Sequence, residues 1–197
     1  MKRKIAVALV VFALGVAPFS LLAQMAPPGP LEDDLFKWMA GNWEGTTDSF
    51  KGKSNDELEI DWDLEHQFVN LHLKSKIAET DPAKLEAMAK AMGMTKEQMQ
   101  TPYKGVGYLT INPETKEYIG YWFGSMRDIS VGKGTREGNK ITMTWEGPQG
   151  SEMRTFEKAG EDKLVMNFEV KDPQGNVMKG TTTLVRKAKK AKADKKS

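Results

Sequence analysis

The sequence predicts an all-β protein: an antiparallel β-barrel of about ten strands, with an N-terminal plug helix and a short helical insertion. Residues 57–64 and 68–78 alternate strictly between apolar and polar side chains. This pattern is typical of strands with one buried face and one solvated face. From residue 104 onward, short apolar segments recur at even spacing between clusters of Gly, Pro, Asn and Asp. Such spacing indicates strands joined by tight turns, as in an antiparallel sandwich or barrel.

The stretch 31–45, LEDDLFKWMAGNWEG, predicts the plug helix and the start of the first strand. Pro30 suits the first turn of a helix, and Gly41 suits its end. Trp43 then opens the strand, where a large aromatic residue most often serves the core. Four apolar residues share one helical face at the spacing of a 3.6-residue turn: Leu31, Leu35, Trp38 and Met39.

The strands are expected in two groups, three before residue 79 and seven after residue 104. Turn sequences such as Asn112-Pro113 separate most members of the second group. Together they are enough to close a barrel. The predicted ranges are 42–50, 57–64, 68–78, 105–112, 117–124, 126–135, 140–146, 151–158, 163–171 and 176–186.

The helical insertion is predicted at 81–101, between the third and fourth strands. Asp81-Pro82 is typical of a helix start, and Thr95 with Gln98 resembles a capping box for a second helix. Its apolar stripe would lie on the open barrel end, either as a movable lid or as a fixed seal. The residues expected to form the lid are Leu85, Met88 and Met92.

The ends of the chain are expected to lie outside the barrel domain, which is predicted at 31–186. Residues 1–23 have the basic start, apolar run and final small residue of a secretory signal peptide, with an uncleaved anchor as the alternative. Residues 24–30 predict a flexible leader, and 187–197 a disordered Lys-rich tail. The protein is therefore expected to be periplasmic or secreted, without a stable membrane span after processing.

Composition argues against several classes of function. Residues 24–186 carry 20 basic and 26 acidic side chains, which argues against a nucleic-acid-binding face. There is no cysteine, and the two histidines, His66 and His72, poorly support a metal site. No nucleophile elbow, phosphate loop or zinc-protease motif is present in the sequence. We therefore expect no catalytic residues, no metal and no cofactor, and a protein that is not an enzyme.

Four segments together resemble DUF1579, a bacterial family of unknown function, over roughly residues 31–187. The resemblance implies a lipocalin-like fold. In the wider calycin group, a Trp on the first strand packs against an Arg near the closing segment. This implies a structural contact between Trp43 and Arg186, plausibly a cation–π contact. The chain has Gly124 where the family often has Asp, and its later strands lack the haem-ligating His of nitrobindin-like barrels. The segments are Gly41-Asn42-Trp43, YKGVGY at 103–108, YIGYWFGSM at 118–126 and VMKGTTTLVR at 177–186.

The expected function is that of an exported barrel that binds a small apolar or amphipathic ligand. The alternative is a structural or interaction protein whose interior is filled by side chains, because barrels of this strand number can do either. The sequence indicates neither the ligand nor the oligomeric state. The side chains expected to line the pocket, chosen by alternation, are Trp62, Leu71, Leu73, Tyr121, Phe123, Met143, Trp145, Met166 and Phe168.

Overall fold

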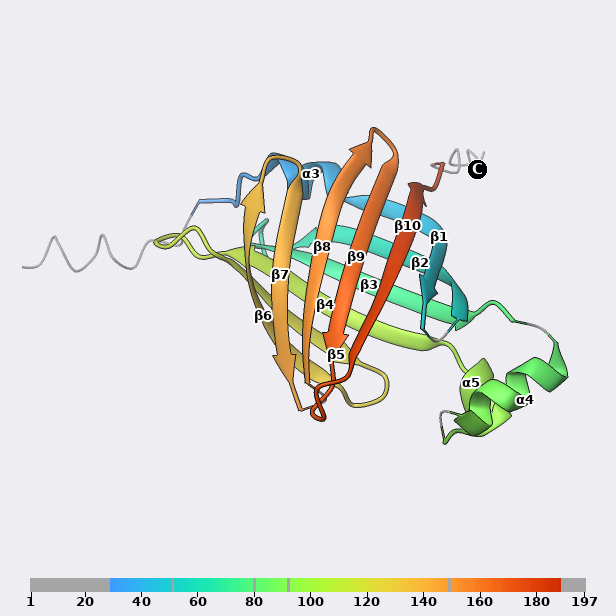
Figure 1. Ribbon diagram of the computed structural model, residues 1–197. Helices are drawn as coiled ribbons and strands as arrows, with labels where there is room; N and C mark the ends of the chain where they lie inside the picture. Colours follow the sequence, from blue (N-terminus) through green and yellow to red (C-terminus); the bar gives the residue numbers. More distant parts are fainter. Residues whose placement is uncertain (1–28, 51, 80, 92, 149, 189–197) are drawn as a thin grey trace, which may run out of the picture. The chain divides into compact units, whose positions relative to one another are not determined.

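Ten antiparallel strands close into a barrel in the computed structural model (Figure 1). The structure describes residues 29–50, 52–79, 81–91, 93–148 and 150–188. The chain divides at residue 30 into two units, and the barrel belongs to the second, which begins at Leu31. The predicted signal peptide, residues 24–28 of the leader and the tail beyond residue 188 lie outside the described residues. The predicted fold class is confirmed.

Each strand pairs with the next one along the chain, and β10 pairs back with β1 to close the barrel. A closed sheet has no free edge at which another chain could add a strand. Helix α3 precedes the strands, and α4 and α5 lie between β3 and β4. The elements are α3 Asp34–Met39, β1 Gly41–Ser49, β2 Gly52–Asp63, β3 Phe68–Ile77, α4 Pro82–Ala91, α5 Lys96–Gln100, β4 Tyr103–Ile111, β5 Tyr118–Gly124, β6 Ile129–Glu137, β7 Lys140–Gly147, β8 Gly150–Gly160, β9 Lys163–Lys171 and β10 Val177–Arg186.

Two strand starts differ from the prediction by several residues. β2 begins at Gly52 rather than at residue 57, because Ser54 and Asp56 continue its inward face with polar side chains that hydrophobic alternation does not reveal. β6 begins at Ile129 rather than at residue 126. The intervening residues form a turn in which Arg127 has a φ of 63°, which ends the pairing.

Helix α3 closes one barrel end, and it is shorter than predicted. Asp33 is its N-cap and accepts a hydrogen bond from the Phe36 backbone N–H at 2.7 Å. Pro30 therefore lies before the helix and not in its first turn, because the Asp33 cap fixes the start. The Asp33 carboxylate also accepts hydrogen bonds from the Tyr118 hydroxyl at 2.6 Å and from Arg136 at 3.1 Å. These contacts tie the helix to β5 and β6.

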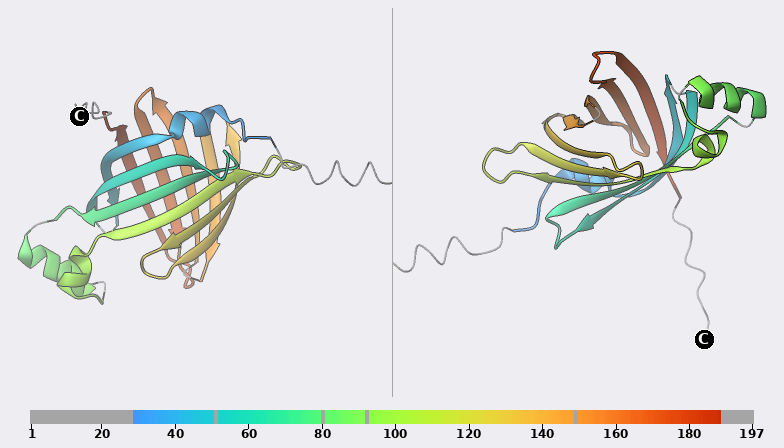
Figure 2. Two further views of the ribbon diagram at one scale, coloured as in Figure 1. Left: turned by 180° about the vertical axis from the view of Figure 1, so that it is seen from behind. Right: turned by 90° about the horizontal axis from the view of Figure 1, so that it is seen from below.

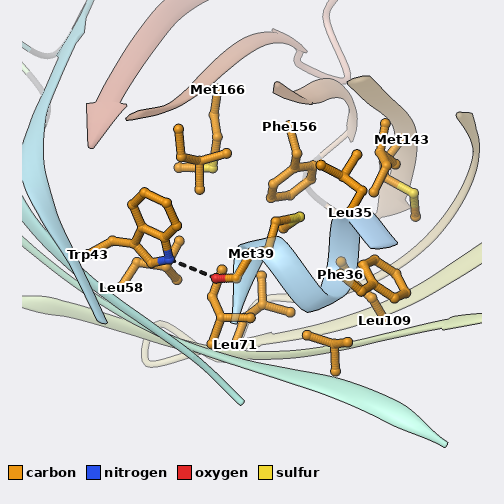
Figure 3. Packing of buried hydrophobic residues seen from close by; sticks show 14 of the residues in the cluster. Leu35, Phe36, Met39, Trp43, Leu58, Leu71, Leu109, Met143, Phe156 and Met166 are labelled. Carbon is orange, nitrogen blue, oxygen red and sulfur yellow. Dashed lines mark hydrogen bonds between the residues drawn. The ribbon is translucent and has the colours of Figure 1, made fainter. Parts of the chain in front are cut away.

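The hydrophobic core fills the half of the barrel next to α3 (Figure 3). Phe36 and Met39 are fully buried, and Trp43 donates its indole N–H to the Met39 carbonyl at 2.8 Å. In the figure these side chains meet those of the surrounding strands with the helix between them. The buried members of this core are Leu35, Phe36, Met39, Trp43, Leu58, Ile60, Val69, Leu71, Leu109, Tyr118, Ile141, Met143, Trp145, Phe156, Leu164, Met166 and Leu184.

The predicted contact between Trp43 and Arg186 is present at the seam between β1 and β10. The two residues are direct cross-strand partners, and the guanidinium carbon lies 4.2 Å from a Trp43 ring centroid. Arg186 also donates to the carbonyl oxygens of Ala40 at 2.8 Å and Trp38 at 2.6 Å. A Cβ on Gly41 would lie 2.7 Å from the same guanidinium, so only glycine leaves room for it. The arginine thus joins the seam to the end of α3.

The two inserted helices bury their apolar residues away from the barrel core. Leu85 and Ala89 of α4 and Met99 of α5 are buried, yet none belongs to the core cluster. The helices contact each other, and α5 touches β3. Figures 1 and 2 show them beside the barrel end that lies opposite α3.

Leu85 and Ala89 of the predicted stripe are therefore buried outside the barrel core, and the role of the insertion as lid or seal stays a prediction. Of the expected lid residues, Leu85 is buried in this helical pair. Met88 approaches the β1–β2 turn, where its Cε lies 3.3 Å from the position of a Cβ on Gly52. Met92 lies outside the described residues.

Replacing residues 80–101 with a short turn should leave the barrel folded, with its free energy of unfolding changed by less than about 1 kcal/mol. The physical reason is that the buried residues of the insertion lie outside the barrel core, while β3 and β4 pair up to Ser75 and Tyr103 without it. Urea denaturation measures the change. A Gly/Ser segment of equal length at the same place is the control. A loss of cooperative unfolding in the shortened protein alone would show that the helices support the barrel.

Candidate functional site

On β5, β8 and β9 the inward side chains change from buried to partly exposed along the barrel axis. On the inward face of β9, Leu164 and Met166 are buried, whereas Phe168 is partly exposed. On β5, Tyr118 is buried and Trp122 partly exposed. These inward side chains are thus buried next to α3 and partly exposed toward the other barrel end. We call this second part the open half. Its inward-facing side chains include Thr47, Asp56, Ser75, Tyr103, Trp122, Asp128, Trp145, Glu152, Arg154, Phe168 and Val170.

Three aromatic rings line the open half directly against the backbone of the barrel wall. A Cβ on Gly105 would lie 2.1 Å from a ring carbon of Trp122, which is closer than any real side chain allows. Glycine at such positions lets a ring lie against the sheet, so less of the interior is filled. The contacts are Trp122 with Gly105 and Gly107, Trp145 with Gly120 and Gly132, and Phe168 with Gly180.

A first polar chain in the open half joins Trp122, Tyr103 and Asp128. The Trp122 indole N–H donates to the Tyr103 hydroxyl at 2.8 Å, and that hydroxyl donates to Asp128 Oδ2 at 2.6 Å. Burial, and next the hydrogen bond to the Asp128 carboxylate, raise the pKa of Tyr103 well above its ordinary value. Tyr103 therefore remains a hydrogen-bond donor at neutral pH. Asp128 Oδ1 is buried and has no hydrogen-bond partner among the residues that the structure describes.

A second polar cluster surrounds Asp56, which is 3% exposed. Its carboxylate accepts hydrogen bonds from Ser54 Oγ at 2.9 Å, from Ser75 Oγ at 2.6 Å and from Thr47 Oγ1. Thr47 also shares a hydrogen bond of 2.6 Å with Thr182. The hydroxyls thus satisfy both oxygens of a buried carboxylate.

Arg154 and Glu152 form the third polar group, on β8. Arg154 Nε donates to Glu152 Oε1 at 2.5 Å, and its guanidinium carbon lies 5.0 Å from the centre of the Phe168 ring. The pair is one-quarter exposed, which suits a cavity wall in contact with solvent. Trp145, across from Glu152 on β7, is 7% exposed, and its indole N–H has no partner within the described part of the chain.

The structure separates the nine predicted pocket residues into several groups. Leu71, Met143 and Met166 are buried in the core next to α3, and Trp62 and Leu73 are packed partly buried against that core. These five fill the barrel rather than line a pocket. Trp145 is a buried member of the same core and borders the open half, and Phe168 has its side chain in the open half.

The assignment of Tyr121 and Phe123 to the interior is wrong. Their side chains are 42% and 45% exposed on the outer face. Alternation on this strand runs through Tyr118, Gly120 and Trp122, and the space at Gly120 is taken by the ring of Trp145. In a run where both faces carry aromatic residues, a glycine on the inner face hides the true alternation.

Sequence reasoning missed the polar residues of the open half. Asp56 could have been found by extending the alternation of Leu58, Ile60 and Trp62 backward along the same strand. No alternation in the sequence marks Asp128 or Arg154 as inward-facing. Which side chains surround them depends on the pairing register of the strands.

Two depressions of about 330 and 300 Å³ lie on the outer surface of the sheet around β2 and β3. Polar side chains such as Glu59 and His72 line both, so neither resembles the expected apolar cavity. Within the described ranges, no group of three or more His, Asp or Glu is placed to hold a metal ion. No described helix is both long enough and apolar enough to span a bilayer.

Comparison with known proteins identifies the fold and not the family. No family model matches the sequence, and no curated protein does. Among solved structures, the S-type phycobiliprotein lyase CPES from Guillardia theta gives a TM-score of 0.56 at 12% identity, over 80% of this chain and 93% of that chain. The fold is that of a lipocalin-like barrel.

Two weaker likenesses add no argument about this lipocalin-like barrel. A de novo designed fluorescence-activating β-barrel gives a TM-score of 0.41 at 12% identity, over 79% of this chain and 100% of that chain. Bovine odorant-binding protein gives 0.34 at 13% identity, over 81% and 77%.

Proposed function

We propose that this lipocalin-like barrel binds a small amphipathic ligand in its open half. The observation that carries the proposal is the change in exposure along single strands, from buried Met166 to partly exposed Phe168 on the same face. Barrels of this size either fill with side chains or hold one small ligand. Here one half is filled and the other is accessible, so the ligand occupies only part of the barrel length.

The lining of the open half sets the amphipathic character of the ligand. The rings of Trp122, Trp145 and Phe168 lie against the barrel wall, so they provide apolar surface and leave space in the interior. Between them lie polar groups on Tyr103, Asp128 and Arg154. Ligand sites in proteins commonly combine apolar walls with a few fixed polar groups of this kind.

Three expectations from the sequence also belong to the proposal. The DUF1579 resemblance supports family membership, and the pattern of residues 1–23 supports export to the periplasm or medium. The absence of catalytic motifs from the sequence supports a binding role rather than an enzymatic one. The N-terminal sequence of the protein recovered from the periplasm tests the export.

Filling the open half should abolish ligand binding. Val170 faces inward at the rim of the open half, so Val170→Trp should raise the Kd of the neutral probe N-phenyl-1-naphthylamine at least about tenfold, which is 1.4 kcal/mol. Lys171→Trp, which adds the same ring to the exposed neighbour, is the control and should leave the Kd unchanged. Probe fluorescence measures both, with thermal unfolding as a check of the fold. Absence of probe binding to the parent protein, or equal binding by both variants, would refute the proposal.

A further inference from the structure

We infer that the ligand of the open half is an organic cation, an ammonium-type group on an aromatic or apolar body that also carries a hydrogen-bond acceptor. This inference rests on the proposed function and assigns its chemical class. Four features support it: the charge balance of the open half, one unsatisfied carboxylate oxygen, the aromatic wall beside that oxygen, and one unsatisfied indole N–H.

The charge balance of the open half is negative. Its inward-facing charged side chains, as far as the structure describes them, are three carboxylates and one guanidinium. Arg154 is already paired with Glu152 at 2.5 Å. Asp56 and Asp128 remain, and neither takes part in an ion pair among the described residues. Carboxylates removed from water are stabilised by a cation. A positively charged ligand group supplies one, whereas an anionic group is repelled.

Asp128 is the carboxylate that still has an unused hydrogen-bond acceptor for this group. The oxygens of Asp56 already accept hydrogen bonds from three hydroxyls. Asp128 accepts one hydrogen bond, from Tyr103 to Oδ2, and its buried Oδ1 accepts none in the described structure. A buried acceptor without a donor is unfavourable, and an ammonium N–H of the ligand would satisfy it with a charge-assisted hydrogen bond.

The wall beside Asp128 is aromatic. Trp122 donates to Tyr103, and Tyr103 donates to Asp128, so both rings are held near the carboxylate. One face of the Trp122 ring lies against Gly105 and Gly107, which leaves the other face toward the interior. An indole face is the most favourable aromatic surface for a cation, and a nearby carboxylate adds to the attraction.

The indole N–H of Trp145 indicates the second feature of the ligand. The ring atoms nearest to Gly120 and Gly132 belong mainly to the six-membered ring, so the N–H edge faces away from these strands. Trp145 is more than nine-tenths buried, and this N–H has no partner in the part of the chain described. A buried donor of this kind calls for an acceptor such as a carbonyl or sulfonyl oxygen on the ligand.

Three dansyl probes that differ only at one end test the charge of the ligand. They are dansylcadaverine, a cation at pH 7, its neutral N-acetyl derivative, and dansyl-6-aminohexanoic acid, an anion. The sulfonamide of each can accept a hydrogen bond from Trp145. Fluorescence titration of the full folded protein should give a Kd for the cation at least about tenfold below those of the neutral and anionic probes.

Asp128→Asn should raise the Kd of the cation to that of the neutral probe and leave the neutral probe unchanged. Asp61→Asn, which removes an exposed outer-face carboxylate from β2, is the matched control and should change neither. Trp145→Phe keeps an aromatic ring but removes the N–H, and it should weaken the cationic and neutral probes by the same factor. Circular dichroism and thermal unfolding check that each variant is folded.

The outcomes separate the inference from the function on which it rests. Tightest binding of the anionic probe, or an equal loss of all three probes in Asp128→Asn, would overturn the cationic class while small-ligand binding stands. Failure of all three dansyl probes and of N-phenyl-1-naphthylamine to bind the parent protein would overturn both.

Discussion

Replacing Phe36 with alanine should lower the free energy of unfolding by about 3–5 kcal/mol, the usual range for a buried phenylalanine. Phe36 is fully buried and is the centre of the plug. Its ring meets Tyr118 edge-on at a centroid distance of 5.4 Å and Trp62 at 6.3 Å. The truncation would leave a cavity between α3 and the barrel wall that the closed sheet cannot collapse to fill. Urea denaturation followed by tryptophan fluorescence measures the effect.

Lys37→Ala is the control for this experiment, because Lys37 follows Phe36 on the same short helix and its side chain is exposed. It should change the free energy of unfolding by less than about 0.5 kcal/mol. If both substitutions lower the free energy of unfolding equally, Phe36 contributes to helix formation and not to packing in the barrel. A negligible effect of Phe36→Ala would show that α3 is not part of the core.

Arg186→Ala should lower the free energy of unfolding by about 1–3 kcal/mol. The variant loses the cation–π contact with Trp43 and leaves the carbonyl oxygens of Trp38 and Ala40 without their donor. Arg186→Lys keeps the charge but not the planar fork, so it should recover less than half of the loss. Thermal and urea denaturation measure both variants.

Lys163→Ala, at an exposed position on the adjacent strand β9, is the control for the arginine series and should unfold like the parent. If Arg186→Lys restores the full free energy of unfolding, the positive charge alone stabilises the seam between β1 and β10. In that case the bidentate contacts to the end of α3 would carry no measurable stability.

Alternation predicted the strands well where one face is apolar and the other charged. Leu58, Ile60 and Trp62 were placed inward because acidic residues separate them, and the structure has them so. Tyr121 and Phe123 were misplaced because both faces of β5 are apolar there, and only the register with Trp145 on β7 decides which face is inner. The contact between α4 and α5 was not predictable from the stripe, because α5 is a helix of five residues with little pattern of its own.

The candidate site was the least predictable part of the molecule. Of its polar chain, Tyr103 and Asp128 are 25 residues apart in sequence, and they meet because the β4–β5 hairpin returns the chain to the same barrel end. Arg154 reaches the site from β8, and its importance depends on Glu152 and Phe168, one on its own strand and one across the ladder. Such groups become visible only when the register of several strand pairs is known.

The seam between the first and last strands also sets the order of events when the chain folds. Trp43 cannot meet Arg186 until 143 further residues have been synthesised, which takes roughly 7–30 s at ordinary translation rates. Until then β1 lacks one of its two neighbours, and the half-built sheet exposes an unpaired edge to other nascent chains. Closure of this barrel therefore waits for the synthesis of β10, the last strand to be made.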